Sequence, residues 1–265
     1  MFRLGISSLC FASQDFSYLT NFIASLKINL WELVDDGLHF LDDNKINNLL
    51  NATSTLNIEF SLHAPYTSVN ISATNYKTRE FSMKLYRECV EHAHKLGCKN
   101  IVFHPGLLDP LTYLFSDLRK PIDDGIYFLL NLGDMCNDYD ITPLIENLAS
   151  DRSIILSIND FKKIFSNSNT LMMALDISHA HLMNIFNDYL SNFCDRIKYF
   201  HISSNDGKID RHWPLNFGSN YWKEYVKRIL NAGLGGPLII ENLSINDSLE
   251  SLTVLRSYIF DELPT

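Results

Sequence analysis

Histidine and carboxylate residues stand at the ends of several short apolar runs in this 265-residue sequence. Four of these runs end in His63, His104, Glu146 and Glu241. Imidazole nitrogens together with carboxylate oxygens are the donors that bind Zn²⁺, Mn²⁺ and Fe²⁺ in proteins. The residue types therefore indicate a metal site, provided that the fold brings the ends of the runs together.

Further donors of the same kind lie close to two other runs. One run ends in Asp176, with His179 three residues later; another contains His201 and is followed by Asp210 and His212. Any one of these residues alone is more often a hydrogen-bonded or surface residue than a ligand. Together, four carboxylates and five imidazoles at one place would leave buried like charges that only cations neutralise. Nine donors exceed the capacity of one ion, so we expect two or three divalent ions, zinc first, with manganese or iron(II) as alternatives.

The elements that position these residues alternate eight times between β-rich runs and segments of helical periodicity. The predicted strands are Arg3–Ser8, Asn29–Val34, Ile58–His63, Asn100–His104, Thr142–Glu146, Leu171–Asp176, Lys198–Ser203 and Leu238–Glu241. The predicted helices are Phe16–Leu26, Asn44–Ser54, Thr78–Leu96, Asp123–Asn137, Asn159–Ser166, Ala180–Phe193, Tyr221–Ala232 and Ser248–Phe260. Eight such units predict an α/β fold, a single (β/α)8 TIM barrel over residues 1–265, ahead of a doubly wound sheet. In a TIM barrel the strand ends form one face, where active sites are built.

Composition limits the kinds of partner and compartment. The formal net charge of −9 comes from 22 Lys and Arg against 31 Asp and Glu, which argues against binding nucleic acid by bulk charge. Five cysteines without a Cys-x-x-Cys pair favour free thiols in a reducing, cytoplasmic compartment. No apolar run approaches the ~18 residues of a membrane-spanning helix, so no membrane partner is expected.

The donor set resembles that of the xylose isomerase-like TIM-barrel superfamily (AP endonuclease family 2), which includes endonuclease IV and the sugar phosphate isomerases and epimerases. In endonuclease IV nine residues hold a trinuclear zinc cluster, and the residues here that match it in type and order are His63, His104, Glu146, Asp176, His179, His201, Asp210, His212 and Glu241. Asp210-Arg211-His212 and His104-Pro105-Gly106 also resemble motifs of that enzyme. The resemblance implies that Glu146 bridges two ions and that Tyr66 falls where a residue enters DNA.

Other stretches are more similar to the isomerase and epimerase branch. Residues 30–37 (LWELVDDG) resemble its second-strand segment, and residues 205–207 (NDG) resemble its seventh-strand loop. This second resemblance implies that Glu146 and Glu241 bind a metal and move protons at adjacent sugar carbons, with Asp176 and His201 completing a single-metal site. Both groups usually carry Gly-Glu-Gly where this chain has residues 216–218 (NFG), which removes one acidic group.

The loops around the expected site favour a small substrate over duplex DNA. An abasic-site endonuclease needs Arg and Lys on several loops, but the loop after the seventh strand offers only Lys208 and Arg211. The acidic residues at 35, 36, 42 and 43 are expected to face outward and repel phosphates, with His39 solvated among them. We therefore expect an isomerase or epimerase of a sugar or sugar phosphate. An endonuclease IV-like zinc phosphodiesterase acting on DNA is the alternative, and a non-catalytic metal-binding barrel the third.

Five residues near the expected site are candidates for contact with the substrate. A phosphate could be received by the cationic pair and a sugar ring by the aromatic ones, although salt bridges, solvation or packing would equally explain these side chains. The candidates are Glu32, Tyr66, Lys208, Arg211 and Trp213.

Overall fold

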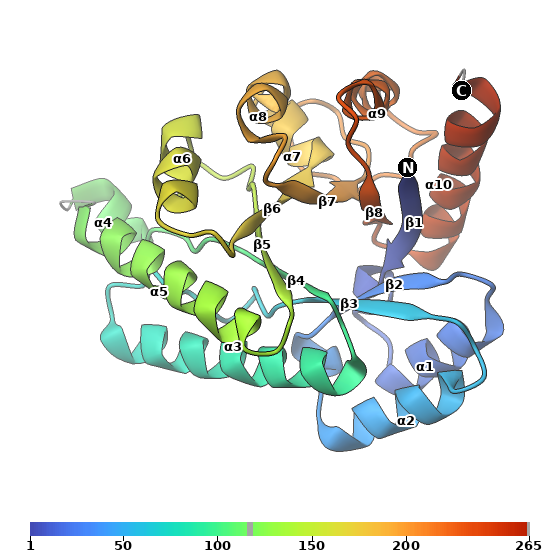
Figure 1. The fold of residues 1–265 in the computed structure, drawn as a ribbon, viewed down its shortest axis with the longest axis horizontal. Coiled ribbons are helices and arrows are strands. Elements are labelled where there is room, and N and C mark those ends of the chain that lie inside the picture. Colours follow the sequence, from blue (N-terminus) through green and yellow to red (C-terminus); the bar gives the residue numbers. More distant parts are fainter. Residues whose placement is uncertain (116–118, 264–265) are drawn as a thin grey trace.

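The computed structural model describes residues 1–115 and 119–263, and its strands form one closed barrel (Figure 1). Eight parallel strands follow one another in chain order, and β8 pairs with β1 to close the barrel. The strands are β1 Phe2–Ser7, β2 Leu30–Val34, β3 Glu59–His63, β4 Asn100–Phe103, β5 Thr142–Glu146, β6 Met172–Asp176, β7 Ile197–Ile202 and β8 Gly236–Ile240. The predicted (β/α)8 fold is confirmed. The extent of the domain, residues 1–265, stays a prediction.

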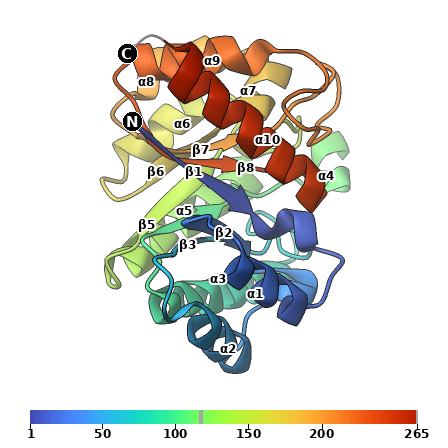
Figure 2. The same cartoon turned by 90° about the vertical axis from the view of Figure 1, so that its right-hand side faces the viewer.

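Helices lie on the outer sides of the strands in both views (Figures 1 and 2). The α-helices of the described residues are α1 Phe16–Ser25, α2 Asp43–Thr53, α3 Tyr76–Leu96, α4 Pro110–Phe115, α5 Arg119–Asn137, α6 Ile158–Ser166, α7 Ile177–Leu182, α8 Phe186–Phe193, α9 Tyr221–Asn231 and α10 Ile245–Ser257. Short 3₁₀ turns follow two strands as η1 Ser8–Phe11 and η2 Gly37–His39, and a π turn, η3 Tyr258–Glu262, follows α10. None of the helices in the described part of the chain combines the length and apolar character that crossing a membrane requires.

The helix predicted over Ala180–Phe193 is in fact two helices. Asn184 lies between α7 and α8 with φ 53°, the left-handed region that an α-helix of L-residues cannot contain. The break lets α7 begin directly at the end of β6, with Asp176 as its N-cap. One turn of α7 then places His179 above the barrel mouth.

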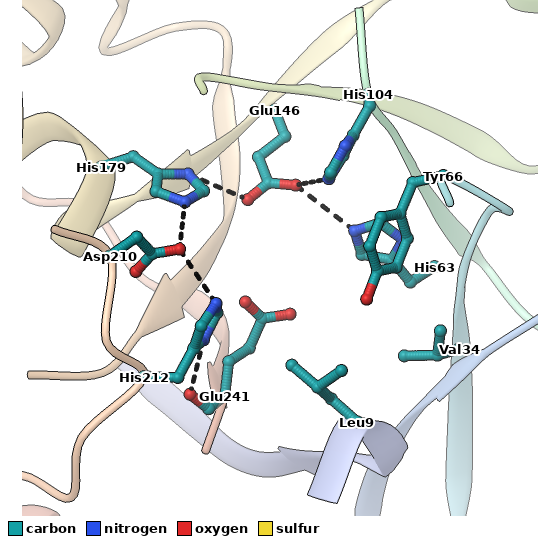
Figure 3. Close-up of a pocket in the computed structure, with 10 residues that line it drawn as sticks. All are labelled: Leu9, Val34, His63, Tyr66, His104, Glu146, His179, Asp210, His212 and Glu241. Atoms are coloured by element: carbon teal, nitrogen blue, oxygen red, sulfur yellow. Dashed lines mark hydrogen bonds and ion pairs between the residues drawn. The ribbon is translucent and has the colours of Figure 1, made fainter. Parts of the chain in front are cut away.

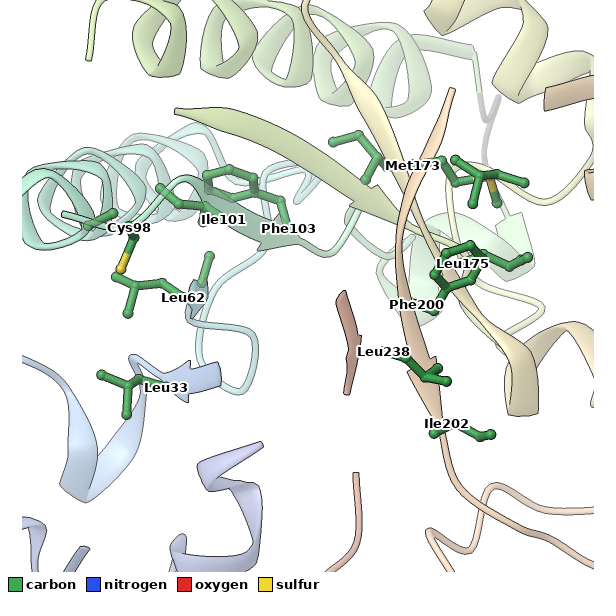
Figure 4. Close-up of a cluster of buried hydrophobic side chains, with 14 of the residues drawn as sticks. Leu33, Leu62, Cys98, Ile101, Phe103, Met173, Leu175, Phe200, Ile202 and Leu238 are labelled. Atoms are coloured by element: carbon green, nitrogen blue, oxygen red, sulfur yellow. The ribbon is translucent and has the colours of Figure 1, made fainter. Parts of the chain in front are cut away.

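The strands present two different faces, as the alternation of side chains along a strand requires. Outward residues such as Leu33, Leu62, Phe103, Leu175 and Phe200 belong to the large core between the strands and the helices (Figure 4). A separate inner layer fills the barrel and consists of Leu30, Val102, Leu144, Ala174, Tyr199 and Ile239. This inner layer is a packed floor rather than a pore.

Most of the expected metal ligands stand two residues beyond this apolar layer. Residues i and i+2 of a strand share a face, so the layer above the floor is occupied by the residues that follow Val102, Leu144, Ala174, Tyr199 and Ile239 by two. Those residues are His104, Glu146, Asp176, His201 and Glu241. The strand period therefore places these five donors on the same inward face as the five floor residues, one layer higher, where they form a ring at the carboxyl ends of the strands.

The expectation of an outward-facing acidic cluster after β2 is wrong for Asp35 and Asp36. Asp35 is fully buried; it accepts a hydrogen bond from the Leu41 N–H and lies 2.8 Å from His92 Nδ1. Asp36 accepts hydrogen bonds from the N–H groups of Tyr66 and Thr67. Both carboxylates fix the loops by accepting hydrogen bonds from backbone N–H groups outside the strands.

The other residues of this loop are also partnered. Asp42 is the N-cap of α2 and accepts from the Lys45 N–H, while Asp43 is exposed and pairs with Lys95. His39, expected to be solvated, is buried, with Nε2 3.0 Å from the Gln14 carbonyl. The loop is thus a packed structural element, and only part of its charge faces water.

We predict that Gly5→Ala destabilises the barrel. A Cβ at this position would lie 2.7 Å from Ile239 Cδ1 and 2.9 Å from the Leu30 carbonyl oxygen, in the packed floor. Overpacking of this kind costs about 1–3 kcal/mol in the free energy of unfolding, measured by urea denaturation. Ile239→Val removes Cδ1 and should therefore cost less in the Gly5→Ala protein than in the wild type. Wild-type stability of Gly5→Ala would contradict the tight packing of the floor.

Candidate metal centre

A small cavity opens at the carboxyl ends of the strands (Figure 3). Its volume is about 150 Å³, below the ~300–1,000 Å³ typical of sites for drug-sized ligands. The lining residues are Leu9, Val34, His63, Tyr66, His104, Glu146, His179, Asp210, His212 and Glu241. Seven of the nine expected donors line the cavity, and Asp176 and His201 lie buried beside them.

The first group of donors joins β3, β4 and β5. His63 Nε2 lies 3.3 Å and His104 Nε2 3.1 Å from the same oxygen, Oε2 of Glu146. One donor atom from each residue lies within 4.8 Å of the other two, close enough to hold one ion. His104 retains more solvent exposure than His63, so this group is at the open side of the site.

The second group lies deeper and shares Glu146 with the first. It consists of Glu146, Asp176, His201 and Glu241, all buried, with one donor atom of each within 4.8 Å of the rest. His201 Nδ1 lies 3.2 Å from Glu146 Oε1 and 3.6 Å from Glu241 Oε1. Glu146 is therefore common to the two groups.

The third group comes from α7 and from the loop between β7 and α9. Asp210 Oδ2 lies 3.1 Å from His179 Nε2 and 3.0 Å from His212 Nε2. His212 has φ 49°, a left-handed conformation that is rare for a residue with a side chain. Strain of this kind concentrates at functional sites; here it turns His212 toward Asp210.

The ring nitrogens of three histidines test whether these residues fit metal ions. His63, His179 and His212 each direct Nδ1 at a backbone carbonyl, at 2.9, 2.9 and 3.0 Å respectively. A carbonyl only accepts, so Nδ1 carries the proton and the other nitrogen, Nε2, faces a carboxylate with its lone pair. Such an arrangement needs either a second proton or a cation between the groups. Asp210 Oδ1 is also buried without a partner among the described residues. The donors fit divalent ions.

Without metal, the buried site shifts the protonation of its groups. Burial opposes charge on His63 and His212, but nearby carboxylates, Glu146 for His63 and Asp210 for His212, raise each pKa to about 9. Burial and the neighbouring carboxylates raise the pKa of Glu241 to about 7. Burial also acts on Glu146, yet His201 and other imidazoles hold its pKa well below the ordinary value. In the metal-free site, protons on these imidazoles and on Glu241 therefore supply the positive charge that metal ions would otherwise supply.

Two asparagines missed by the sequence analysis fix the donors. Asn147 exchanges two hydrogen bonds with the backbone of Asp176, and its carbonyl is the partner of His179 Nδ1. Asn242 donates to the carbonyls of His212 and Trp213, which anchors the loop of the third group. The available signal was the Glu-Asn pair that ends both the fifth and the eighth strand.

The substrate contact expected for Glu32 is corrected by its burial. Glu32 is 0% exposed and is held beneath the site by Tyr199 and His201, so it is neither on the cavity wall nor in a surface salt bridge. Tyr66 does line the cavity, with its ring 4.9 Å from that of His104.

The other three expected substrate contacts lie outside the lining of the cavity. Lys208 is exposed, and the Arg211 guanidinium points at Asp206 and lies over the Trp213 ring. Trp213 packs against Phe217. Their contact with a substrate stays a prediction.

The fold and the site place the chain among known proteins. It belongs to the xylose isomerase-like TIM barrel family, whose model matches residues 21–258. The protein MJ1311 of Methanocaldococcus jannaschii is 26% identical over 264 residues, 97% of this chain and 89% of that protein.

The chain is also similar to an epimerase-like protein and to a probable endonuclease. The crystal structure of a D-tagatose 3-epimerase-like protein has a TM-score of 0.87 at 26% identity and covers 97% of each chain. The probable endonuclease 4 of Listeria monocytogenes is 25% identical over 178 residues, 59% of this chain and 57% of that protein. Similarity to the epimerase-like structure extends over the whole barrel, whereas that to the endonuclease covers part of it.

We predict that zinc binding to the metal-free protein releases protons and tightens as pH rises. With folded-state pKa values of about 9, His63 and His212 are protonated at pH 7.5, whereas a ligand imidazole must present a lone pair. The affinity should increase up to about pH 9 and then level off. Calorimetric titration in two buffers of different ionisation enthalpy counts the protons. Binding without proton release would contradict the protonation assigned to this site.

Proposed function

We propose that this protein is a metal-dependent isomerase or epimerase of a small polyhydroxy carbonyl compound such as a ketose. The observation that carries the proposal is the pair of carboxylates from β5 and β8, Glu146 and Glu241, which reach one cavity of about 150 Å³ from different strands. Figure 3 shows both carboxylates directed toward the interior of the cavity. The similarity to the epimerase-like structure over 97% of the chain supports this choice.

The two carboxylates can serve as the base and the acid of a proton transfer. One removes the proton from the carbon next to the substrate's carbonyl, which leaves an enediolate and a protonated carboxyl. The other carboxyl, protonated beforehand, gives the epimer when it delivers its proton to the opposite face of the same carbon. Delivery of the proton to the former carbonyl carbon, with transfer of the hydroxyl proton to the former carbonyl oxygen, gives the isomer. Divalent ions, zinc first and manganese or iron(II) otherwise, would polarise the carbonyl and the adjacent hydroxyl. We propose His63, His104, Glu146, Asp176, His179, His201, Asp210, His212 and Glu241 as their ligands.

The remaining wall of the cavity determines how the substrate lies. Leu9 and Val34 form an apolar side, and the Tyr66 ring covers His63 and His104. We propose that Tyr66, as part of the cavity wall, packs against the carbon chain of the substrate. The lining residues include no Lys or Arg, so a phosphate on the substrate would have to be met by the metal ions. Five free cysteines accord with the cytoplasm as the proposed location.

A second candidate is phosphodiester hydrolysis at an abasic site in DNA. The third donor group, Asp210 between His179 and His212, favours it, because one metal would suffice for proton transfer, whereas multi-metal sites stabilise both oxygens in phosphoryl chemistry. The partial similarity to endonuclease 4 points the same way. Against it stand the small cavity and a lining without Lys or Arg, because duplex binding relies on phosphate contacts.

We predict that Glu241→Gln lowers turnover by about 10²–10⁴-fold, the contribution of a general base, with the fold retained. The assay is incorporation of solvent deuterium into ketoses by zinc-loaded protein, read by mass spectrometry. Glu224→Gln, an exposed change on α9, is the matched control and should keep wild-type activity. Wild-type exchange by Glu241→Gln would remove this residue from the chemistry.

Incubation with a duplex that contains a tetrahydrofuran abasic analogue separates the two candidates. We expect no incision by the wild type under conditions in which ketoses exchange deuterium. Incision that disappears in Glu146→Gln, without deuterium exchange, would overturn the isomerase proposal in favour of the hydrolase.

A further inference from the structure

A buried polar network lies directly beneath the candidate metal centre. Glu32 Oε2 accepts hydrogen bonds from Tyr199 Oη, at 2.9 Å, and from His201 Nε2, at 3.0 Å. Tyr199 Oη in turn lies 2.6 Å from Ser61 Oγ. The three strands β2, β3 and β7 supply these groups inside the barrel, where Tyr199 belongs to the floor layer and His201 to the donor layer above it.

Glu32 differs from the groups that hold the other histidines of the site. His63, His179 and His212 each donate from Nδ1 to a neutral backbone carbonyl. His201 is turned the other way: its Nε2 faces the Glu32 carboxylate and its Nδ1 faces Glu146 and Glu241. Among these four imidazoles, only that of His201 has a carboxylate, rather than a backbone carbonyl, as the partner of the nitrogen that faces away from the donor group.

The chemistry of this contact follows from what a carboxylate can do. An ionised carboxylate only accepts, so the proton of His201 is held on Nε2 and the lone pair of Nδ1 points at the second donor group. A charged acceptor also raises the basicity of the imidazole toward a metal more than a carbonyl does. Glu32 Oε1 is buried without a partner among the described residues, so few other hydrogen bonds compete with His201 for this charge.

We propose that Glu32 is a positioning residue for the metal in the second donor group: it fixes the tautomer and ring orientation of His201 and strengthens its bond to a divalent cation. The inference rests on the metal site of the proposed function and is independent of the reaction performed there. Loss of such an outer partner typically weakens metal binding by 10–100-fold.

The test measures zinc binding by Glu32→Gln, which keeps the shape of the side chain and removes its charge. At a fixed, buffered free zinc concentration that fills the wild type, the variant should retain one equivalent fewer by elemental analysis. Restoring that equivalent should take about 10–100-fold more free zinc. The matched control is Glu59→Gln, the same change at the exposed start of β3, where Glu59 pairs with Arg3; its zinc binding should be that of the wild type.

A spectroscopic measurement separates positioning from a general structural role. In ¹H–¹⁵N spectra of the zinc-loaded protein, the imidazole N–H that donates to a carboxylate should appear as a slowly exchanging, downfield proton. Glu32→Gln should move this resonance upfield, and Glu59→Gln should leave it in place. Glu32→Asp, which keeps the charge but draws the carboxylate back from Nε2, should weaken zinc binding as well, and serves if the glutamine variant fails to fold.

The outcomes distinguish this inference from the proposal on which it rests. Zinc affinity within twofold of the wild type in folded Glu32→Gln, with the resonance unmoved, overturns the role of Glu32 and leaves the metal site intact. A wild-type protein that binds no zinc overturns the metal site and the role of Glu32 together.

Discussion

The burial of several carboxylates at one barrel mouth is the constraint on which the rest of the site depends. Glu146, Asp176 and Glu241 are each at most 6% exposed, and they converge on one side of the same strands. Isolated buried carboxylates would cost several kcal/mol each, so every one needs a cation or a donor within reach. Protonated imidazoles between the carboxylates can neutralise this negative charge. When the imidazoles are neutral, divalent ions can neutralise it instead. The groups whose contacts stabilise the fold when the imidazoles are protonated are thus the same ones that, in the proposed function, would hold the metal ions.

The barrel meets this constraint by dividing its interior into layers. Apolar side chains from successive strands close the floor, and the next inward position on each strand is polar. Because the layers come from the strand period, most donors need no special loop to bring them together; of the nine, His179, Asp210 and His212 lie more than one residue beyond a strand. Those three depend on other devices: an N-cap at Asp176, a left-handed residue at 212, and the hydrogen bonds of Asn147 and Asn242. The strand-borne donors are thus fixed by the fold itself, and the loop-borne ones by local hydrogen bonds.

The sequence was sufficient to predict the barrel and the convergence of the donors, because both follow from local patterns: alternation of elements and a polar residue at each strand end. Contacts between distant segments were not predictable in this way. Asp35 follows a strand and looks like a loop residue, yet it is buried through His92, 57 positions later. Glu32, near the end of the second strand, was expected to contact the substrate, but it is buried at the level where Tyr199 and His201 meet it from β7. Its depth depends on strand register around the barrel, which no local pattern encodes.

The formal charge of −9 takes on a different meaning once these depths are known. Five carboxylates surround the proposed ions, namely Glu32, Glu146, Asp176, Asp210 and Glu241, and three divalent cations would exceed their combined charge by one. Without Glu32 the excess of positive charge would be larger. In the proposed role, Glu32 thus lowers the positive potential at the mouth as well as orienting His201. A site close to electrical balance suits an enediolate, whose charge develops during the reaction and is stabilised by nearby cations. It suits a strongly anionic duplex less well, because the described residues lining the mouth add no Lys or Arg beyond the ions.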